Sequence, residues 1–486
     1  SSKRPRTGPP SASRRSAALC STTPSARFGH AEGAVLEGPA SQGGAGNPAR
    51  VLARWLREHG ALEGLDIVTL ETGCLAVRTE RAFTADEPFG RLPVAAIIDP
   101  VRWLEAEPVA LRALSLGASA PFAFWLALAD GLRMPAHLFA PYLHALPAES
   151  PEPCAWPEVL RERGLRGTPL VAQVAAQLKQ LRTEFERVSS AAPAVSWADL
   201  LWARGVHQSR CFPRELIEAA KCAGCTHGAL AGGAVFAVEL GVGSTAWVRA
   251  KGTVETAKVA EVAEAAPATH AAGLGCMLPL YDLLDHRPGE QIRWEAGGGS
   301  VRFRCAEAVS GGQELFNNYG SQSNGELLYA HGFAMAENVH DTVDGFYRVH
   351  DTDDSLLVGP FSLGGGSGRV IPLELLVGPQ VVALEAAGEQ LALSLDDLEG
   401  LGDVFQSRLD SLLETQADDA AAAEGTRESF CAHYRDGQRR VLRAALAELA
   451  EMFAAAAGGE ESEDESEESA ESGASSDDGA GRSSVS

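Results

Sequence analysis

Residues 274–333 limit the possible folds more than any other part of the chain. This stretch contains two segments in which acidic, amide and aromatic side chains are close together, at residues 277–286 and 313–320. Between them, residues 301–309 alternate between apolar and polar side chains, which predicts a half-buried β-strand. We therefore interpret the rest of the chain as a scaffold that holds these two segments.

Length, charge and cysteine content limit the class of protein. The 486 residues are enough for about two or three domains with a sizeable core. The formal net charge of −24 disfavours binding to nucleic acid and favours a basic partner or a lysine-bearing protein substrate. Nine cysteines are too few for a disulfide framework. No apolar run approaches the roughly 20 residues that cross a bilayer, so we expect no contact with a membrane.

One cysteine pair with a nearby histidine resembles part of a zinc-binding site. Cys222, Cys225 and His227 have the spacing of half such a site, but no second cysteine pair follows at zinc-finger spacing. We therefore expect no metal ion, and we interpret residues 215–272 as a variable insertion.

The two ends of the chain are expected to lie outside the fold. Residues 1–31 are basic, rich in serine and free of acidic side chains, which is typical of an organelle transit peptide. A disordered basic tail and a nuclear signal are the alternatives, so residues 1–45 leave the chloroplast, the cytoplasm and the nucleus open as compartments. Residues 458–486 are rich in serine and acidic side chains and are expected to be disordered.

The region before residue 274 is predicted to begin with mixed structure and to become helical. Apolar periodicity predicts a helix over residues 49–59, and short apolar runs predict strands over 65–70, 73–78 and 92–98. From about residue 111 to 206 the pattern is helical.

Two helix starts in this helical region are predicted from their capping residues. Thr168 followed by Pro169 predicts an N-cap for a helix whose apolar face recurs through residues 170–188. Ser196 with Asp199 three residues later predicts a capping box.

The remaining predicted elements flank and follow the second motif segment. A strand over residues 292–294 and a glycine turn precede the alternating strand at 301–309. Strands over 342–349 and 356–358 and a helix over 428–453 follow.

Five short motifs, in the same order, resemble those of the SET-domain methyltransferases, specifically the Rubisco large-subunit lysine methyltransferase-like group. They are Pro121 to Trp125 with Pro141 to Pro147, Ser209-Arg210-Cys211-Phe212, Asp282-x-x-Asp285-His286, Asn318-Tyr319-Gly320 with Ser323-Asn324-x-Glu326, and Tyr434-Arg435-x-Gly437-Gln438. The resemblance implies an α+β architecture: a SET-domain β-clip fold with a helical insert, followed by a mainly α-helical C-terminal domain.

The resemblance also implies domain boundaries. The SET domain would cover residues 46–335, with the helical insert at about 108–206. A Rubisco LSMT-type substrate-binding helical domain would cover residues 340–457. The two motif segments would cross in a knot-like arrangement, an arrangement that is rare among proteins.

The implied activity is transfer of a methyl group from S-adenosyl-L-methionine to a lysine ε-amine of a protein substrate, by a monomer. This displacement at carbon needs no metal, but the amine must be neutral, and the pKa of lysine in water is near 10.4. A narrow aromatic channel beside the sulfonium charge disfavours the ammonium form. Alignment of nitrogen, methyl and sulfur then supplies most of the remaining acceleration.

The resemblance assigns site residues by position. Tyr319 would be catalytic. The cofactor would be bound by Gly73, Cys74, Leu75, Arg210, Asp285 and His286, and the substrate side would be lined by Asp282 and His331.

Three of these positions depart from the family pattern. Cys74 replaces a glycine, Asp285 replaces an asparagine, and His331 replaces a tyrosine. These changes leave two alternatives open: a catalytically weak SET-like protein-binding module, and methylation of a non-lysine side chain such as histidine.

Overall fold

The computed structural model describes residues 47–221, 230–231, 274–349, 357–364, 369–372, 375–376 and 395–471. The predictions made for the basic N-terminal segment, for Cys222, Cys225 and His227, and for most of the variable insertion lie outside these residues.

The N-terminal part of the described chain, up to residue 221, is mainly helical after a short β-rich start. Its elements are α1 (Pro48–Glu58), β1 (Leu65–Thr69), β2 (Leu75–Thr79), β3 (Pro88–Pro93), η1 (Val94–Ala96), α2 (Pro100–Ala106), α3 (Pro108–Ser115), α4 (Ala120–Leu132), α5 (Ala140–Leu143), η2 (Pro153–Ala155), α6 (Glu158–Gly164), α7 (Leu170–Val188), η3 (Ser189–Ala191), α8 (Trp197–Arg210), β4 (Cys211–Phe212) and α9 (Glu215–Lys221).

The second part contains most of the strands and then returns to helix. Its elements are β5 (Leu230–Ala231), β6 (Cys276–Met277), η4 (Tyr281–Leu283), β7 (Asp285–His286), β8 (Ile292–Gly297), β9 (Ser300–Cys305), β10 (Phe316–Asn317), α11 (Asn324–His331), β11 (Thr342–Val349), β12 (Leu357–Gly364), α14 (Leu395–Leu413), α15 (Gln416–Ala420) and α16 (Arg427–Glu471).

Small sheets make up the β part of the fold. The largest has the strand order β3-β9-β8-β5, and four two-stranded sheets are formed by β1-β2, β4-β6, β10-β7 and β11-β12. The β8–β9 hairpin turns at Gly298 and Gly299, whose φ angles of 56° and 76° favour glycine. The β4–β6 pairing joins Cys211 to Met277 and Phe212 to Cys276, so it closes the chain around the variable insertion.

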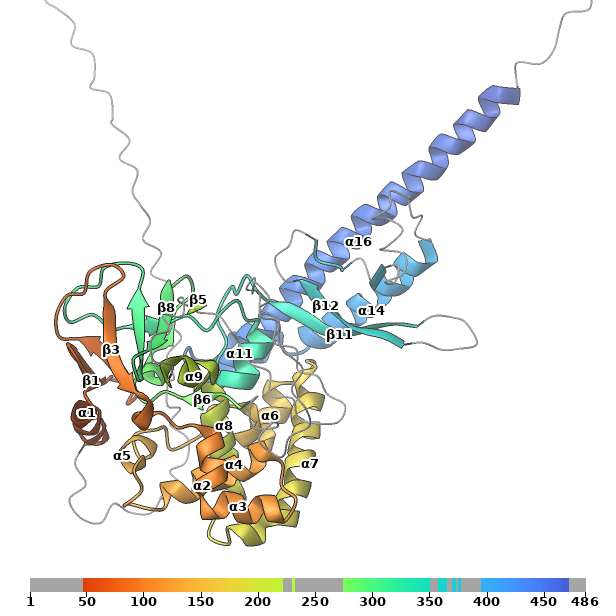
Figure 1. Ribbon diagram of the computed structural model, residues 1–486. Helices are drawn as coiled ribbons and strands as arrows, with labels where there is room; N and C mark the ends of the chain where they lie inside the picture. Colours follow the sequence, from red (N-terminus) through yellow and green to blue (C-terminus); the bar gives the residue numbers. More distant parts are fainter. Residues whose placement is uncertain are drawn as a thin grey trace, which may run out of the picture.

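Helices α2 to α8 form a compact helical layer below the small sheets in Figure 1. Its centre is α4, in which nearly every side chain is buried, including Phe122, Phe124 and Trp125. Helix α8 begins with the predicted capping box, because the Ser196 hydroxyl accepts from the Asp199 N–H and the Asp199 carboxylate accepts from the Ser196 N–H. Within the described residues, no helix has the length and apolar composition to cross a membrane.

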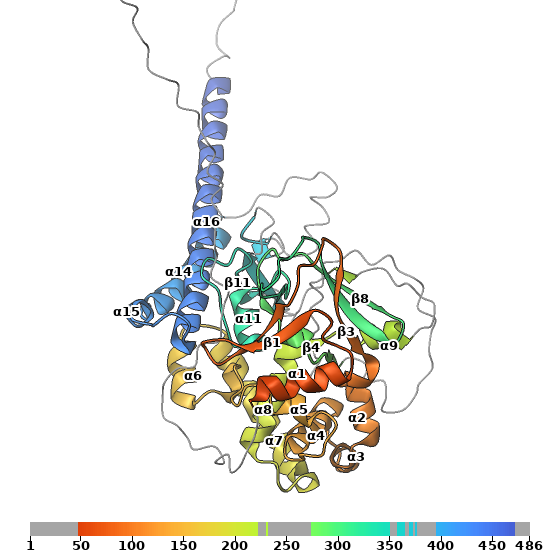
Figure 2. The same cartoon turned by 90° about the vertical axis from the view of Figure 1, so that its left-hand side faces the viewer.

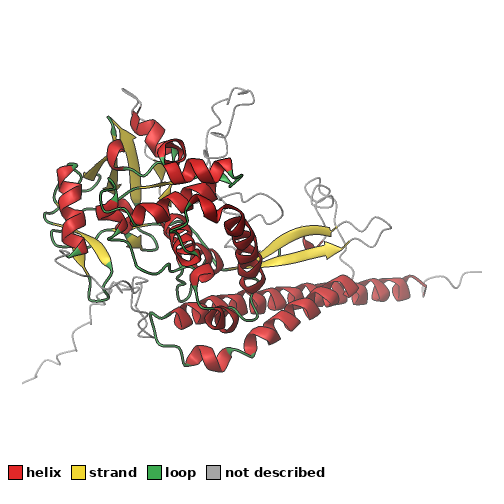
Figure 3. Ribbon diagram, turned by 90° about the horizontal axis from the view of Figure 1, so that it is seen from below, coloured by secondary structure: helices red, strands yellow, loops and turns green. Residues whose placement is uncertain are grey.

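Helix α16 dominates the C-terminal part. Figures 1 and 2 show that its N-terminal portion packs on the body and that its C-terminal portion projects away from it. Figure 3 shows α14 running along α16 beside the β11–β12 hairpin, and buried apolar side chains such as Val343, Phe405 and Leu442 fill the space between these elements.

The C-terminal motif joins α16 to the segment that follows Tyr319. The buried Asp341 carboxylate accepts from the Asn324 backbone N–H and from Arg440, both at 2.8 Å. Gly437 faces this carboxylate so closely that a Cβ would overlap it. The Tyr434 ring lies against Gly325, where an added Cβ would come within 3.2 Å of it, a tight contact without overlap.

Several predicted boundaries were wrong for identifiable reasons. The strand expected at residues 92–98 ends at Pro93, and after the single turn η1, Ile98 pairs separately with Met277. The strand expected at 301–309 ends at Cys305, because Val309 pairs with Phe83 instead.

The start of α7 and the extent of α16 also differ from expectation. Helix α7 begins at Leu170, its N-cap position is occupied by Pro169, and no side chain caps it; the Thr168 hydroxyl donates to the Leu165 carbonyl at 2.6 Å. Helix α16 continues to Glu471, so residues 458–471, which were expected to be disordered, are helical in the structure.

The contact between Gly437 and Asp341 predicts the result of a Gly437→Ala substitution. Asp341 is held by several partners and cannot move aside, so the added methyl group should destabilise the fold by about 1–3 kcal/mol. Gly402→Ala in α14 is the matched control, since no atom lies within 4 Å of a Cβ there and alanine favours the helix. Urea unfolding of both variants measures the difference, and equal stabilities would contradict the packing described here.

Candidate functional site

The site is organised around a two-residue parallel pairing between β7 and β10. Asp285 lies opposite Phe316 and His286 lies opposite Asn317, although about 30 residues separate the two strands in the chain. The Leu315 N–H donates to the Val77 carbonyl at 2.9 Å, which places β2 beside the same segment. The two motif segments and the β1–β2 hairpin are therefore neighbours in space.

The turn η4, just before β7, is held in a strained conformation. Leu280 has a φ of 114°, which a non-glycine residue rarely adopts, and its side chain is fully buried. The next residue, Tyr281, stacks on Phe303 with ring centroids 3.9 Å apart, and its hydroxyl lies 3.1 Å from the carbonyl oxygens of Phe89 and Val301. These contacts fix the turn that carries Asp282.

Tyr319 follows β10 and is held through both its backbone and its hydroxyl. Its N–H donates to Nδ1 of His286 at 3.0 Å, and its hydroxyl donates to the Leu284 carbonyl at 3.1 Å. Burial and the charge of Asp285 raise the pKa of this phenol, so the hydroxyl remains protonated at neutral pH.

Three further rings surround Tyr319. The ring centroids of His286, His331 and Phe333 lie 5.1, 4.7 and 6.3 Å from that of Tyr319. The rings of His286, Tyr319 and His331 come from β7, the loop after β10 and the end of α11, and Phe333 lies two residues beyond that end. They form an aromatic cluster in which the tyrosine is central.

The two histidines of this cluster have opposite tautomers. A backbone N–H can only donate, so Nδ1 of His286 accepts from Tyr319 and the ring proton is on Nε2. A carbonyl can only accept, so Nδ1 of His331 donates to the Ser209 carbonyl at 3.1 Å and Nε2 carries a lone pair. Burial lowers the pKa of both rings to about 4, so both are neutral at physiological pH.

Arg210 and Tyr142 both reach Asp282. Nη1 of Arg210 donates to the Asp282 backbone carbonyl at 2.5 Å and lies 3.9 Å from the carboxylate atom Oδ2. The buried hydroxyl of Tyr142 donates to that Oδ2. Burial raises the pKa of the Asp282 carboxyl to about 6, although Arg210 and the Tyr142 hydroxyl oppose the shift.

Residues Gly73, Cys74 and Leu75 lie at the β1–β2 turn and the start of β2. Gly73 has a φ of 82°, and its N–H donates to the Leu70 carbonyl at 2.9 Å. The half-buried thiol of Cys74 is near enough to Asp285 and Arg210 for their charges to act on it, and burial raises its pKa. Strand β2 contacts the turn η4 that carries Asp282.

The structure therefore brings all the predicted site residues into one region. Sequence reasoning missed the contribution of Tyr142, which it recognised only as part of a motif in the helical insert. It also gave no role to the carbonyls of Ser209 and Leu284, because backbone groups carry no sequence signal of their own.

The chemistry of this region suits a zwitterionic ligand that also carries a positive charge. A guanidinium pairs with a carboxylate group of a ligand, carboxylates pair with ammonium or sulfonium groups, and neutral aromatic rings tolerate a cation.

Among the described residues, no cluster of His, Cys, Asp and Glu side chains could hold a metal ion. Two surface grooves, of about 520 and 400 Å³, are lined by other residues, of α14 and of the η2, α7 and α8 region.

Comparison with curated sequences gives partial matches, and no protein-family model matches the chain. The ribosomal lysine N-methyltransferase set10 of Schizosaccharomyces pombe is 40% identical over 77 residues, 15% of this chain and 14% of that protein. Ribosomal lysine N-methyltransferase 1 of Saccharomyces cerevisiae is 25% identical over 219 residues, 36% of this chain and 38% of that protein. The actin-histidine N-methyltransferase of Drosophila melanogaster is 29% identical over 154 residues, 29% of this chain and 28% of that protein. The matches thus span less than half of each relative's length.

Comparison with solved structures gives a likeness over most of the chain. Rubisco LSMT bound to sinefungin and monomethyllysine matches with a TM-score of 0.58 at 15% identity, over 84% of this chain and 92% of that chain. Rubisco LSMT bound to AdoMet matches with a TM-score of 0.58 at 14% identity, over 84% and 93%. This extent of similarity shows a shared fold.

The hydrogen bond from the Tyr319 N–H predicts the effect of His286→Phe. The substitution leaves a partly buried N–H without its acceptor, which should lower the free energy of unfolding by roughly 1 kcal/mol. His331→Phe is the control in the same ring cluster, and it should lower the free energy less, since a carbonyl tolerates a missing donor better than an N–H tolerates a missing acceptor. Urea unfolding compares the two, and a larger loss for His331→Phe would contradict the assigned bond.

Proposed function

We propose that this chain, which has the α+β SET-domain fold of the Rubisco large-subunit lysine methyltransferase-like group, is an S-adenosylmethionine-dependent protein-lysine N-methyltransferase. The observation that carries the proposal is Tyr319, a partly buried residue whose hydroxyl and backbone N–H are both bound beside the β7–β10 pair inside a cluster of rings. The partial matches to lysine N-methyltransferases from two yeasts support it.

In this proposal S-adenosylmethionine supplies a methyl group on a sulfonium, a good leaving group. Tyr319 is the catalytic residue, because a neutral phenol oxygen can accept from the substrate amine and orient it without adding a full charge. The rings of His331 and Phe333 exclude water beside it. A dry, aromatic surrounding disfavours the ammonium form of lysine and so favours the nucleophile.

The cofactor residues are proposed on the chemistry of their side chains. Arg210 can pair with a carboxylate, and Asp285 can accept from an ammonium. His286 and the backbone of Gly73, Cys74 and Leu75 complete the proposed cofactor side. Asp282 and His331 face the proposed substrate side.

The partner is proposed to be a protein that presents a lysine. Residues 340–457 are the proposed substrate-binding domain, and the chain is proposed to act as a monomer without nucleic acid. The net charge of −24 supports a basic partner.

Histidine methylation is the second candidate function. The partial match to the actin-histidine N-methyltransferase of Drosophila favours it, together with the neutral His331 ring whose Nε2 lone pair can accept from a substrate N–H. Mass spectrometry of methylated peptides distinguishes the two candidates by the modified residue.

The Tyr319→Phe variant tests the proposed activity. We expect the unmodified chain to transfer labelled methyl groups from S-adenosylmethionine to lysines of proteins in a cell extract, and the variant to be roughly 100-fold slower, because one positioned hydroxyl is lost. Tyr329→Phe is the matched control, since its hydroxyl lies near Gln177 and Arg204, outside the ring cluster.

Two outcomes would contradict the proposed activity. Calorimetry that detects no binding of S-adenosylmethionine would exclude an S-adenosylmethionine-dependent methyltransferase. Uptake without any methyl transfer would favour the catalytically weak binding module.

The compartment is a separate proposal that rests on the basic N-terminal segment. We expect residues 1–45, fused to a fluorescent protein, to direct it into the chloroplast, as an arginine- and serine-rich segment poor in acids does. Replacing Arg14 and Arg15 by glutamate is the control and should abolish import. A fusion that stays in the cytoplasm or accumulates in the nucleus would reject the transit peptide.

A further inference from the structure

We propose that Tyr142 is a positioning residue for methyl transfer: its hydroxyl holds one oxygen of the Asp282 carboxylate and leaves the other oxygen for the cation that enters the site. The inference rests on the proposed function and adds a residue from the helical insert to the site. It also explains why the insert and the turn η4 meet at a buried polar contact.

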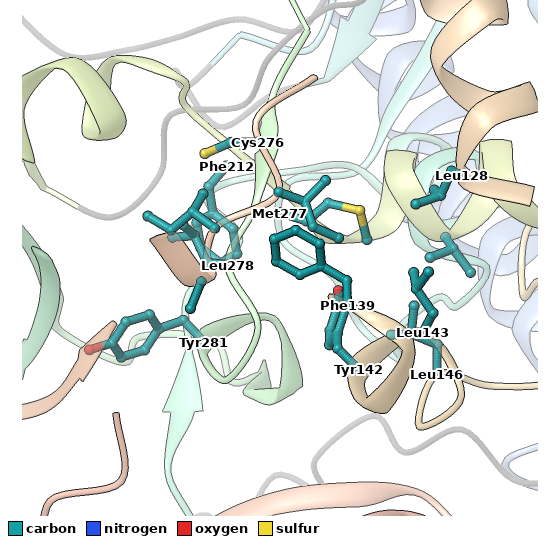
Figure 4. Packing of buried hydrophobic residues seen from close by; sticks show 14 of the residues in the cluster. Leu128, Phe139, Tyr142, Leu143, Leu146, Phe212, Cys276, Met277, Leu278 and Tyr281 are labelled. Atoms are coloured by element: carbon teal, nitrogen blue, oxygen red, sulfur yellow. The ribbon is translucent and has the colours of Figure 1, made fainter. Parts of the chain in front are cut away.

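The position of Tyr142 is fixed by the core around it. The residue belongs to the short helix α5 and is fully buried. Figure 4 shows Tyr142 close to Phe139, Met277 and Leu143, and all four residues belong to the same buried apolar cluster. The hydroxyl donates to Oδ2 of Asp282, a carboxylate 140 residues further along the chain. A carboxylate can only accept in its ionised form, which fixes the direction of the bond.

The second oxygen of the Asp282 carboxylate has no partner. Oδ1 is buried and receives no hydrogen bond from any residue that the structure describes. Native proteins rarely leave such an atom unpaired, since its desolvation is unfavourable. An incoming ammonium group would supply the missing donor together with the opposite charge. The chemical class that Oδ1 fits is therefore a primary ammonium, the group that a lysine substrate carries before it is deprotonated.

The groups that face Asp282 come from several elements. Arg210, at the end of α8, has Nη1 3.9 Å from Oδ2, but its shorter bond is to the Asp282 backbone carbonyl at 2.5 Å. Tyr142 approaches from α5. From the β7–β10 side, the charge of Asp282 acts on Tyr319, and the charge of Asp285 acts on both Tyr319 and Arg210. Tyr142 is thus the side chain that donates directly to the carboxylate. Arg210 supports it through charge, and the nearby backbone of Leu280 and Asp282 also lowers the pKa of the carboxyl.

This arrangement has a consequence for pH dependence. Burial raises the pKa of the Asp282 carboxyl to about 6, and the Tyr142 hydroxyl lowers it. Without the hydroxyl, the pKa of Asp282 rises further, so the carboxylate is protonated over a wider range of acidic pH. Because only the ionised carboxylate attracts a cation, the acidic limb of the activity profile should then move to higher pH.

The test compares Tyr142→Phe with Tyr281→Phe. Tyr281 is also fully buried and is the neighbour of Asp282 in sequence, but its hydroxyl lies near the carbonyls of Phe89 and Val301. Figure 4 shows the two tyrosines reaching into different parts of the core. Tyr281→Phe keeps the ring that stacks on Phe303 and fixes the turn, and it removes only a buried hydroxyl that does not contact the carboxylate. A shift of the acidic limb seen only in Tyr142→Phe therefore reports on the contact with Asp282.

The readout is the rate of labelled methyl transfer from S-adenosylmethionine to cell-extract proteins between pH 5 and 9. Dividing each variant's rate by that of the unmodified chain at the same pH cancels the titration of the substrate lysines. We expect the acidic limb of Tyr142→Phe to move up by about one pH unit, since a hydrogen bond to a charged group is worth about that much. The limb of Tyr281→Phe should stay in place.

Asp282→Asn supplies a second variant that does not depend on the folding of Tyr142→Phe. The amide cannot ionise, so we expect a rate well below that of the unmodified chain at neutral pH and a ratio of the two rates that rises below about pH 6, where the carboxylate of the unmodified chain is protonated. An acidic limb that is unmoved in Tyr142→Phe, or a rate ratio of Asp282→Asn that does not change with pH, overturns the inference. Calorimetry of the unmodified chain with S-adenosylmethionine separates the two levels: no uptake overturns the proposed function and this inference together, whereas uptake with an unmoved limb overturns the inference alone.

Discussion

The parallel pairing of β7 with β10 is the contact on which the site depends. It is only two residues long, and it joins Asp285 to Phe316 and His286 to Asn317. A pairing this short cannot hold itself together, because two isolated short strands are at best marginally stable in water. It persists because Tyr281 fixes the turn before β7 and because the Val77 carbonyl holds the residue before β10. The chemistry of Tyr319 is thus supported by contacts made well away from it.

A second network extends this support to the C-terminal part. Asn324, at the start of α11, binds Asp341 through its backbone N–H, and Arg440 of α16 binds the same carboxylate. Just before Arg440 in α16, Arg435 and Arg439 share the buried carboxylate of Asp419. Removing one partner of a buried ion pair strongly destabilises the folded state, because the other charge is left buried and unpaired. A change in α16 can therefore reach the segment after Tyr319 through α11.

Much of the fold followed from sequence because its signals are local. The capping box at Ser196 and the glycine turn at Gly298 depend on neighbouring residues, and both were predicted correctly. The predicted strand ends failed at Pro93 and Cys305, where a partner from a distant segment decides the pairing. The cap predicted at Thr168 was wrong because α7 begins one residue later, after Pro169, and the Thr168 hydroxyl bonds to the preceding turn.

For the site, the family resemblance identified the side chains, and the structure added how they are held. The opposite tautomers of His286 and His331 depend on which backbone group each ring meets. The contact between Tyr142 and Asp282 joins positions 140 residues apart. Neither relation leaves a pattern in a single sequence, since both arise only when the chain is folded.

The pairing of β4 with β6 has a consequence for how this chain can change over time. It clamps the two ends of the variable insertion at Phe212 and Cys276, next to residues that form the core. The entropy lost on closing a loop grows only with the logarithm of its length, by about 0.6 kcal/mol for each doubling. Apart from α9, which contributes Leu216 and Ile217 to the core, and β5, which pairs with β8, residues can therefore be gained or lost between these clamped ends at little cost, so new recognition elements can be acquired there.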